Sequence, residues 1–214
     1  MSLPPDIERR FAALLGSTSH PQVVAIAGPN GAGKSTFYEA FIKQAGLAFV
    51  NADVLAKNIH HLDVYQAAEM AAVIRKSYLE EKGSFAFETV FSDPEGEKLQ
   101  FLIEAMKAGY TVVMCFIGIS GADRSEQRVG MRVLQGGHDV PSHKLVERFP
   151  RTMRNLVRAM SALPYLFIFD NDDLNDPFRL VEIYEGGSLT WRSPSRPAWL
   201  PSGPGEPTST SITE

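Results

Sequence analysis

Short apolar runs alternate with segments of helical spacing along most of the chain. Five runs rich in β-branched and aromatic residues predict buried strands at 23–27, 47–50, 84–87, 110–117 and 165–169. Between them, apolar residues recur every three to four positions and predict helices at 6–15, 37–46, 63–82, 94–108, 123–135 and 142–162. This alternation predicts an α/β fold with a mostly parallel sheet. Residues 180–184 and 189–191 add a terminal hairpin or a sixth edge strand, so we expect three layers around five to six strands.

A glycine-rich motif lies between the first strand and the helix that follows it. Residues 28–36 read GPNGAGKST and match G-x-x-x-x-G-K-[ST], whose backbone amides bind a polyphosphate at the start of a helix. We expect Lys34 to contact the β- and γ-phosphates of ATP or GTP, and Ser35 to bind Mg²⁺. The alternative, a chance glycine turn, is disfavoured by the flanking strand and helix. The predicted nucleotide-binding residues are Gly28, Pro29, Asn30, Gly31, Ala32, Gly33, Lys34, Ser35 and Thr36.

Two carboxylates follow predicted strands, at the edge where ligands bind to open parallel sheets. Asp53 comes just after the strand at 47–50 and could accept a proton from an attacking hydroxyl, or it could cap the next helix. Glu88 ends the strand at 84–87 and could hold acceptor hydroxyls, reach Mg²⁺ through water, or pair with an arginine. No Asp-Glu pair follows the run at 110–117, which favours a small kinase over a motor-type ATPase.

Basic residues gather in one region of an otherwise acidic chain with a net charge of −4. Arg124, Arg128 and Arg132 are spaced four apart, and the next helix carries a second stripe of Lys144, Arg148, Arg151 and Arg158. Two such helices joined by the glycines at 136–137 predict a lid, at about 121–158, whose guanidinium groups neutralise phosphoryl charge. The alternative is a pair of solvated helix faces.

The remaining composition narrows the class of protein. The acidic balance argues against nucleic acid or an anionic membrane as a partner, and no apolar stretch approaches the ~20 residues of a membrane span. The single Cys115 lies in an apolar run, so we expect a core position, no disulfide and a cytoplasmic protein. We expect a single domain at 1–191, followed by a Pro/Ser-rich and poorly ordered tail at 192–214.

Four blocks in this order resemble the zeta toxin family of P-loop kinases, in its short bacterial form. They are GPNGAGKST, NADVLAKNI at 51–59, FETVFSD at 87–93 and GGHDVPSHKLVERFPRTMRNL at 136–156, and the resemblance covers about residues 23–184. It implies a P-loop kinase-type core that uses ATP and Mg²⁺ to phosphorylate a sugar hydroxyl of a UDP-N-acetyl amino sugar, as a UDP-N-acetylglucosamine kinase does. It also implies an antitoxin protein as a partner.

The resemblance further implies roles for individual residues. It assigns acceptor activation to Asp53, acceptor binding to Glu88 and Thr89, and γ-phosphate binding to lid arginines. The predicted catalytic set is therefore Lys34, Asp53, Arg132, Arg148 and Arg151. One departure is that the block after Glu88 lacks the basic residue expected there in that family. Two further functions fit the sequence: a kinase for another small hydroxyl compound, such as an antibiotic or a sugar acid, and a nucleotide-dependent ATPase switch.

Overall fold

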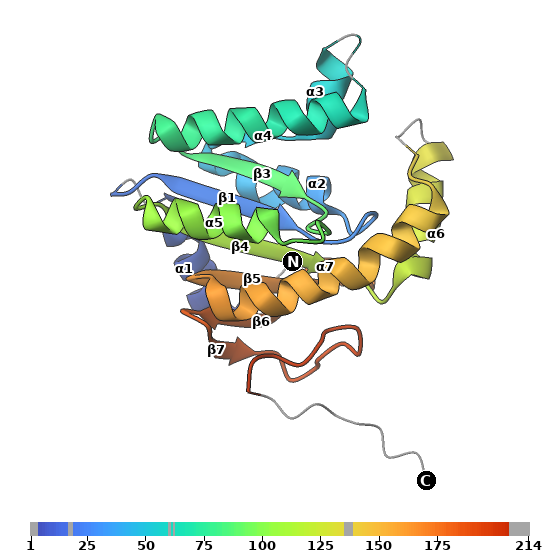
Figure 1. The fold of residues 1–214 in the computed structure, drawn as a ribbon. Helices are drawn as coiled ribbons and strands as arrows, with labels where there is room; N and C mark the ends of the chain where they lie inside the picture. Colours follow the sequence, from blue (N-terminus) through green and yellow to red (C-terminus); the bar gives the residue numbers. More distant parts are fainter. Residues whose placement is uncertain (1–3, 17–18, 60, 62, 135–138, 206–214) are drawn as a thin grey trace.

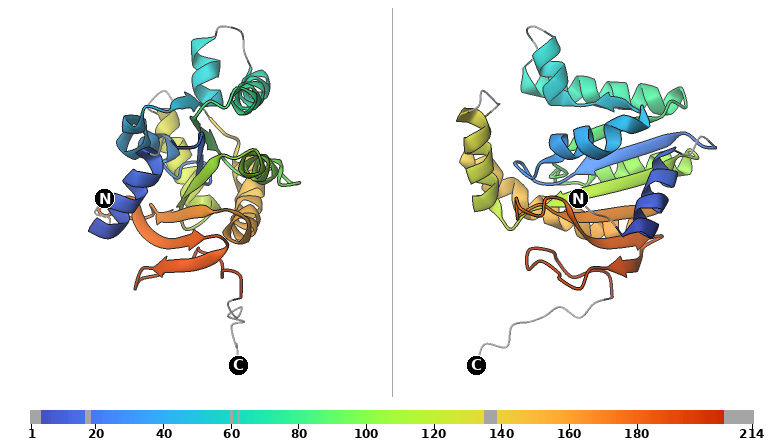
Figure 2. Two further views of the ribbon diagram at one scale, coloured as in Figure 1. Left: turned by 90° about the vertical axis from the view of Figure 1, so that its left-hand side faces the viewer. Right: turned by 180° about the vertical axis from the view of Figure 1, so that it is seen from behind.

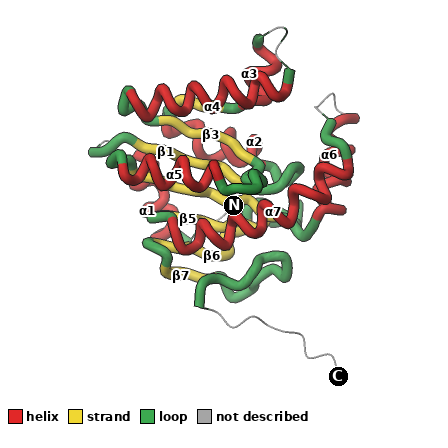
Figure 3. Tube along the Cα trace, in the orientation of Figure 1, coloured by secondary structure: helices red, strands yellow, loops and turns green. Residues whose placement is uncertain are grey.

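A single seven-stranded sheet forms the centre of the protein (Figures 1 and 3). The computed structural model describes residues 4–16, 19–59, 61, 63–134 and 139–205. Five parallel strands lie in the order β2, β3, β1, β4, β5, and an antiparallel hairpin of β6 and β7 extends the sheet beyond β5. Their bounds are β1 (Gln22–Ala27), β2 (Ala48–Val50), β3 (Phe85–Thr89), β4 (Thr111–Gly118), β5 (Tyr165–Asp170), β6 (Arg179–Glu185) and β7 (Ser188–Arg192).

The five parallel strands and the terminal hairpin agree with the apolar pattern. The sheet has seven strands rather than five to six, because both strands of the hairpin pair within it. The alternation of apolar and polar positions gives two strands for this segment, but it does not show that β6 adds to the edge of β5. The fold is α/β with a mostly parallel sheet, as predicted.

Helices cover both faces of the sheet (Figures 1 and 2). One face carries α5 (Glu97–Lys107) and α7 (Ser142–Ala162), and the other carries α1 (Pro5–Gly16) and α2 (Lys34–Phe37). The helices α3 (Ala52–Asn58) and α4 (Val64–Glu80) lie at the β2 end, and α6 (Ala122–Leu134) lies beyond the carboxyl ends of the parallel strands. None of the described helices has the length and apolar character that spanning a membrane requires.

Side chains of β4 alternate between two apolar cores, one on each face of the sheet. Val112, Met114 and Phe116 join the core beneath α5 and α7, while Val113 and Cys115 join the core beneath α1 and α2. Burial raises the pKa of the Cys115 thiol above its ordinary value, which keeps the thiol protonated and unreactive. The prediction of a core cysteine is therefore confirmed.

The helix after the glycine-rich loop is less regular than the pattern predicts. It begins as α2, widens to a π turn at Tyr38–Ile42 and ends in a 3-10 turn at Lys43–Ala45. A cluster of aromatic rings accompanies the wide turn: Phe37 lies 4.9 Å from both Phe41 and Phe169, between ring centroids. Packing from β5 thus accompanies a local shape that residue spacing alone does not indicate.

The first half of the Pro/Ser-rich tail packs on the sheet, which differs from the poor order expected from its composition. Arg196 binds the buried Glu182 of β6 at 2.9 Å, Leu200 is buried, and the Trp199 indole donates to Asp170 Oδ1 at 2.9 Å. Three anchoring side chains within five residues offset the cost of ordering this segment. Residues 206–214 lie outside the described residues.

Candidate functional site

The glycine-rich loop leaves the carboxyl end of β1 and packs directly on β4. Gly28 has φ 144°, Gly31 has φ 73° and Gly33 has φ 92°, which are conformations that side chains disfavour. At Gly28 a Cβ atom would lie 2.1 Å from the carbonyl oxygen of Ile117. The loop therefore approaches the backbone of the neighbouring strand so closely that this position needs glycine.

Lys34 is buried in this loop, with 6% of its surface exposed. Its ammonium group donates to the carbonyl oxygen of Pro29 at 3.0 Å and lies 3.6 Å from Glu88 Oε1. Burial lowers the pKa of Lys34, and the charges of Glu88 and Asp53 oppose that shift. A cation is therefore held inside the glycine loop with two carboxylates nearby.

Glu88 connects three segments at the carboxyl edge of the sheet. Its Oε2 atom accepts hydrogen bonds from Ser35 Oγ at 2.8 Å and from Asn51 Nδ2 at 2.9 Å, while Oε1 faces Lys34. The end of β3, the glycine loop and the exit of β2 therefore meet at one carboxylate.

Asn51, and not Asp53, caps α3. The Asn51 Oδ1 atom accepts hydrogen bonds from the backbone N–H of Asp53 at 2.8 Å and of Val54 at 3.3 Å. The alternative reading of Asp53 as a helix cap is therefore wrong, since Asp53 lies in the first turn of α3. Asp53 instead lines a pocket.

That pocket has a volume of about 220 Å³ and lies between β3, α3 and α4. Asp53, Glu88 and Thr89, the three residues predicted to bind an acceptor, all line it. The Thr89 hydroxyl also accepts a hydrogen bond from Phe91 N at 3.0 Å, so it shapes the turn after β3. The structure thus brings the sequence-predicted acceptor residues together beside Ser35 and Lys34.

The helix α6 lies over the glycine loop. Ser125 Oγ donates to the carbonyl oxygen of Asn30 at 2.6 Å, and a Cβ at Gly31 would lie 3.0 Å from Arg128 Cβ. After burial and the two carboxylates, the charge of Arg132 also affects Lys34 and lowers its pKa. The middle of α6 therefore packs against the glycine loop, while the lid itself stays a prediction.

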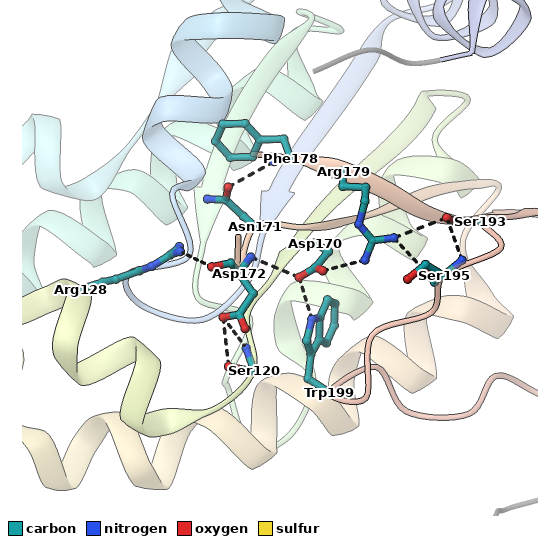
Figure 4. Close-up of polar contacts among 10 residues, drawn as sticks. All are labelled: Ser120, Arg128, Asp170, Asn171, Asp172, Phe178, Arg179, Ser193, Ser195 and Trp199. Carbon is teal, nitrogen blue, oxygen red and sulfur yellow. Dashed lines mark hydrogen bonds and ion pairs between the residues drawn. The ribbon is translucent and has the colours of Figure 1, made fainter. Parts of the chain in front are cut away.

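The loop after β5 holds both the glycine loop and α6 (Figure 4). Asn171 Nδ2 donates to the carbonyl oxygen of Ala32 at 2.8 Å. In the next position, the carbonyl oxygen of Asp172 accepts from Arg128 Nη2 at 3.1 Å, and its carboxylate pairs with Arg124 Nε at 3.2 Å. Arg124 and Arg128 therefore fix α6 to the loop after β5. Asn171 supports the glycine loop, a role that the residue pattern did not indicate.

The second basic stripe lies on α7, which extends beyond the carboxyl ends of the strands (Figure 1). Arg148 is half-buried, and Arg151 pairs with Glu147 at 2.7 Å while its Nε atom is buried without a hydrogen-bond partner among the described residues. Pro150 lies inside the helix between these two arginines. Lys144 Nζ contacts the hydroxyl of Tyr65 on α4 at 3.2 Å, so α7 reaches across to the pocket side.

The zeta toxin family model matches residues 9–185 of the chain, which is most of its length. The chain belongs to the zeta toxin family. Together with this fold, membership of the zeta toxin family supports a nucleotide-dependent phosphotransferase. No curated protein matches the sequence significantly.

Solved structures share this fold at low sequence identity. A complex of AvrRxo1-ORF1 and ORF2 with ATP has a TM-score of 0.62 and 18% identity, over 86% of this chain and 66% of that chain. The PezAT chromosomal toxin–antitoxin system of Streptococcus pneumoniae has a TM-score of 0.59 and 13% identity, over 85% of this chain and 83% of that chain. At these identities the likeness concerns the fold.

The donor atoms of this zeta toxin family member fit a magnesium ion bound together with a nucleotide. No group of three or more His, Cys, Asp or Glu side chains suited to a metal occurs among the described residues, so a fully protein-built metal site is absent from that part. Ser35 Oγ and Glu88 Oε2 are 2.8 Å apart beside the glycine loop. Magnesium in such sites takes few protein ligands and completes its shell with phosphate oxygens and water.

The predicted lid, at about 121–158, includes residues 135–138, which the structure does not describe. The glycines at 136–137, which were expected to join the two arginine-bearing helices, lie outside the described residues. The helices on either side end at Leu134 and begin at Ser142, close to the predicted bounds.

Proposed function

We propose that this protein transfers the γ-phosphoryl group of ATP, with Mg²⁺, to a hydroxyl group of a UDP-N-acetyl amino sugar. One observation supports this most directly: Glu88 contacts Ser35 and Lys34 of the glycine loop and also lines the pocket that contains Asp53. A donor bound in the loop and an acceptor bound in the pocket would therefore meet at this carboxylate.

In the proposed reaction, the acceptor oxygen attacks the γ-phosphorus and the bond to the β–γ bridging oxygen breaks, which leaves ADP. Asp53 orients the acceptor hydroxyl and takes its proton. Glu88 and Thr89 hold the acceptor, and the glycine loop from Gly28 to Thr36 holds the triphosphate. Bound Mg²⁺, held by Ser35, would neutralise phosphate charge.

Lys34 and three lid arginines would stabilise the charge on the transferring group. Lys34 lies in the loop, and Arg132 is close enough for its charge to affect Lys34. Arg148 and Arg151 lie on either side of Pro150 in α7. The Nε atom of Arg151, which is buried without a hydrogen-bond partner among the described residues, could serve a phosphate oxygen. We assign these roles to Arg132, Arg148 and Arg151 as part of the proposal.

A smaller acceptor, such as a sugar acid, is the second candidate. The pocket volume of about 220 Å³ is below the roughly 300–1,000 Å³ of pockets for drug-sized ligands, and this favours a compact molecule or only the sugar end of a larger one. An antitoxin partner is a further part of the proposal, because PezAT, which shares this fold, is a toxin–antitoxin system.

A mass-spectrometric acceptor screen with ATP and Mg²⁺ tests the proposal. We expect ATP consumption to depend on an amino-sugar nucleotide, and to fall at least 100-fold in Lys34→Ala and Asp53→Asn, since each removes a group that acts on the transferring phosphoryl or the attacking oxygen. Asp6→Asn, an exposed site on α1, is the control and should leave the rate unchanged. ATP turnover that persists in Asp53→Asn and responds to no acceptor would instead indicate an ATPase switch.

A further inference from the structure

The pocket beside Asp53 contains a buried cation that the proposed reaction does not use. Arg75 of α4 lines this pocket, and only 9% of its surface is exposed. Arginine is seldom buried to this degree unless an anion pairs with it. Within the part of the chain that the structure describes, no carboxylate forms an ion pair with Arg75 and no oxygen accepts a hydrogen bond from it.

Aromatic rings hold the Arg75 guanidinium in place. Its central carbon lies 5.1 Å from the ring centroid of Phe87 and 5.8 Å from that of Phe101. Such stacking orients a guanidinium and offsets part of its desolvation, but it leaves the N–H donors unused. Burial lowers the pKa of Arg75, which reflects the cost of holding this charge away from water. An anionic ligand bound to the guanidinium would offset this desolvation cost.

The charges around the pocket are divided by sign. Asp53 and Glu88 supply the negative groups, while Arg75 and Lys98 supply the positive ones. Among the described residues, the Lys98 ammonium group pairs with the exposed Glu97, at 3.6 Å, and with no other carboxylate, so it too can serve a ligand. A molecule with a hydroxyl group at one end and an anionic group at the other would match this arrangement.

We propose that the acceptor carries a phosphate or carboxylate group and that Arg75 binds this group. The inference rests on the proposed function, in which this pocket holds the acceptor. Arg75 acts as a specificity residue: its planar fork of donors binds either anion in a bidentate manner, and Lys98 adds a second positive charge. The anion is the diphosphate of a sugar nucleotide or the carboxylate of a sugar acid, and the experiment separates these two sources.

Steady-state kinetics on paired acceptors tests the proposal in the full chain. The pairs are UDP-N-acetylglucosamine with neutral N-acetylglucosamine, and gluconate with neutral glucose. We expect the anionic member of one pair to be phosphorylated with a kcat/KM at least 100-fold above its neutral partner. In Arg75→Met, which keeps an unbranched chain against the two rings, KM for that acceptor should rise at least tenfold while KM for ATP stays within twofold.

Lys76→Met is the matched control, because Lys76 is the exposed neighbour of Arg75 on the same helix. It should change each KM by less than twofold. A neutral acceptor used as well as its anionic partner, or an unchanged acceptor KM in Arg75→Met, overturns the assignment of Arg75 even if phosphoryl transfer itself is found.

A second measurement judges the anion site without turnover. With a non-hydrolysable ATP analogue and Mg²⁺ present, UDP-N-acetylglucosamine or gluconate should raise the Tm of the wild type and not that of Arg75→Met. If no acceptor is phosphorylated, the proposed function fails, and equal Tm shifts in both proteins then overturn the anion site as well. Without ligand, Arg75→Met should melt at or above the wild-type Tm, because it removes a buried cation. A lower Tm with unchanged acceptor KM would show that Arg75 serves only packing.

Discussion

At the residue scale, Gly28 shows how the backbone of a neighbouring strand limits the glycine loop. Its φ of 144° and the nearby carbonyl oxygen of Ile117 both exclude a side chain. The obstructing atom belongs to the central strand β4, whose hydrogen bonds to β1 and β5 prevent it from moving aside. Glycine at this position therefore supports the fold as well as phosphate binding.

A Gly→Ala substitution is expected to change stability in opposite directions at two positions. Gly28→Ala should lower the free energy of unfolding by about 2–3 kcal/mol, since the added methyl group overlaps Ile117 O. Gly130→Ala on α6 should raise it by about 0.5–1 kcal/mol, because nothing lies within 4 Å and alanine favours the helix. Urea unfolding measures both, and equal effects at the two positions would contradict this account.

Some residues of the site could be predicted from sequence and others could not. Lys34 and Ser35 follow from a motif with a known mechanism, and Asp53 and Glu88 follow from their places after strands. Asn51 was missed, although an asparagine immediately before a helix is a common cap. No residue pattern indicates a role for Arg75, because its contacts are with Phe87 and Phe101, which come from two other segments of the chain.

At the element scale, the short loop after β5 fixes the start of α6. Ser120 donates to Asp172 Oδ1 through both its N–H, at 3.2 Å, and its hydroxyl, at 3.0 Å, and Arg124 adds a charged contact. Burial alone would raise the pKa of Asp172, but these hydrogen bonds and the Arg124 charge outweigh it, so the pKa lies below its ordinary value. The folded state therefore favours the ionised carboxylate.

Asp172→Asn should consequently reduce stability in a manner that depends on pH. Because the folded pKa of Asp172 lies below the ordinary 3.8, its contribution is fully present above that pH and is lost as pH falls through the folded pKa. We expect a loss of about 1 kcal/mol at pH 7, a modest value because Arg124 is partly exposed. Urea unfolding at pH 7 and pH 3 should show the difference narrowing in acid.

The exposed Asp173→Asn serves as the control and should change stability by less than about 0.5 kcal/mol at either pH. A loss in Asp172→Asn that is the same at pH 7 and pH 3 would show that its charge plays no part.

Elements with a strong apolar period were predicted well, and their departures have local causes. The strand at 110–117 became β4, and the helix at 142–162 became α7 with the same bounds. The π turn at Tyr38–Ile42 was not predicted, because it is accompanied by aromatic contacts that include Phe169 of the distant strand β5. The tail was expected to be poorly ordered because of its Pro/Ser content. Composition does not indicate that Arg196 and Trp199 bind residues of the sheet.

At the scale of the whole molecule, the segment at 193–205 connects the end of the chain to the centre of the sheet. Trp199 lies against the face of β4, where a Cβ at Gly118 would meet its ring at 2.0 Å, and its indole N–H binds Asp170 (Figure 4). Asp170 also pairs with Arg179 of β6 at 2.9 Å. Through Asp170, Trp199 of this segment and Arg179 of the hairpin are both bound to the parallel strand β5.

Trp199→Ala should therefore lower the free energy of unfolding by about 2 kcal/mol, a reduced value for a large ring that is only half-buried. Leu189→Ala on the exposed edge strand β7 is the control and should cost less than about 0.5 kcal/mol. Thermal and urea unfolding measure both variants. If the two cost the same, the segment after β7 is not part of the cooperative fold.

Pro150 makes α7 easier to bend at its middle than a helix without proline. Proline has no backbone N–H, so the carbonyl oxygen of Val146 loses its intrahelical donor within α7. The half that carries Arg148 can therefore change its direction relative to the half packed on the sheet without breaking another backbone bond. A change in this bend would move Arg148 relative to Arg151, which lies beyond the proline, so the two predicted phosphate ligands need not move together.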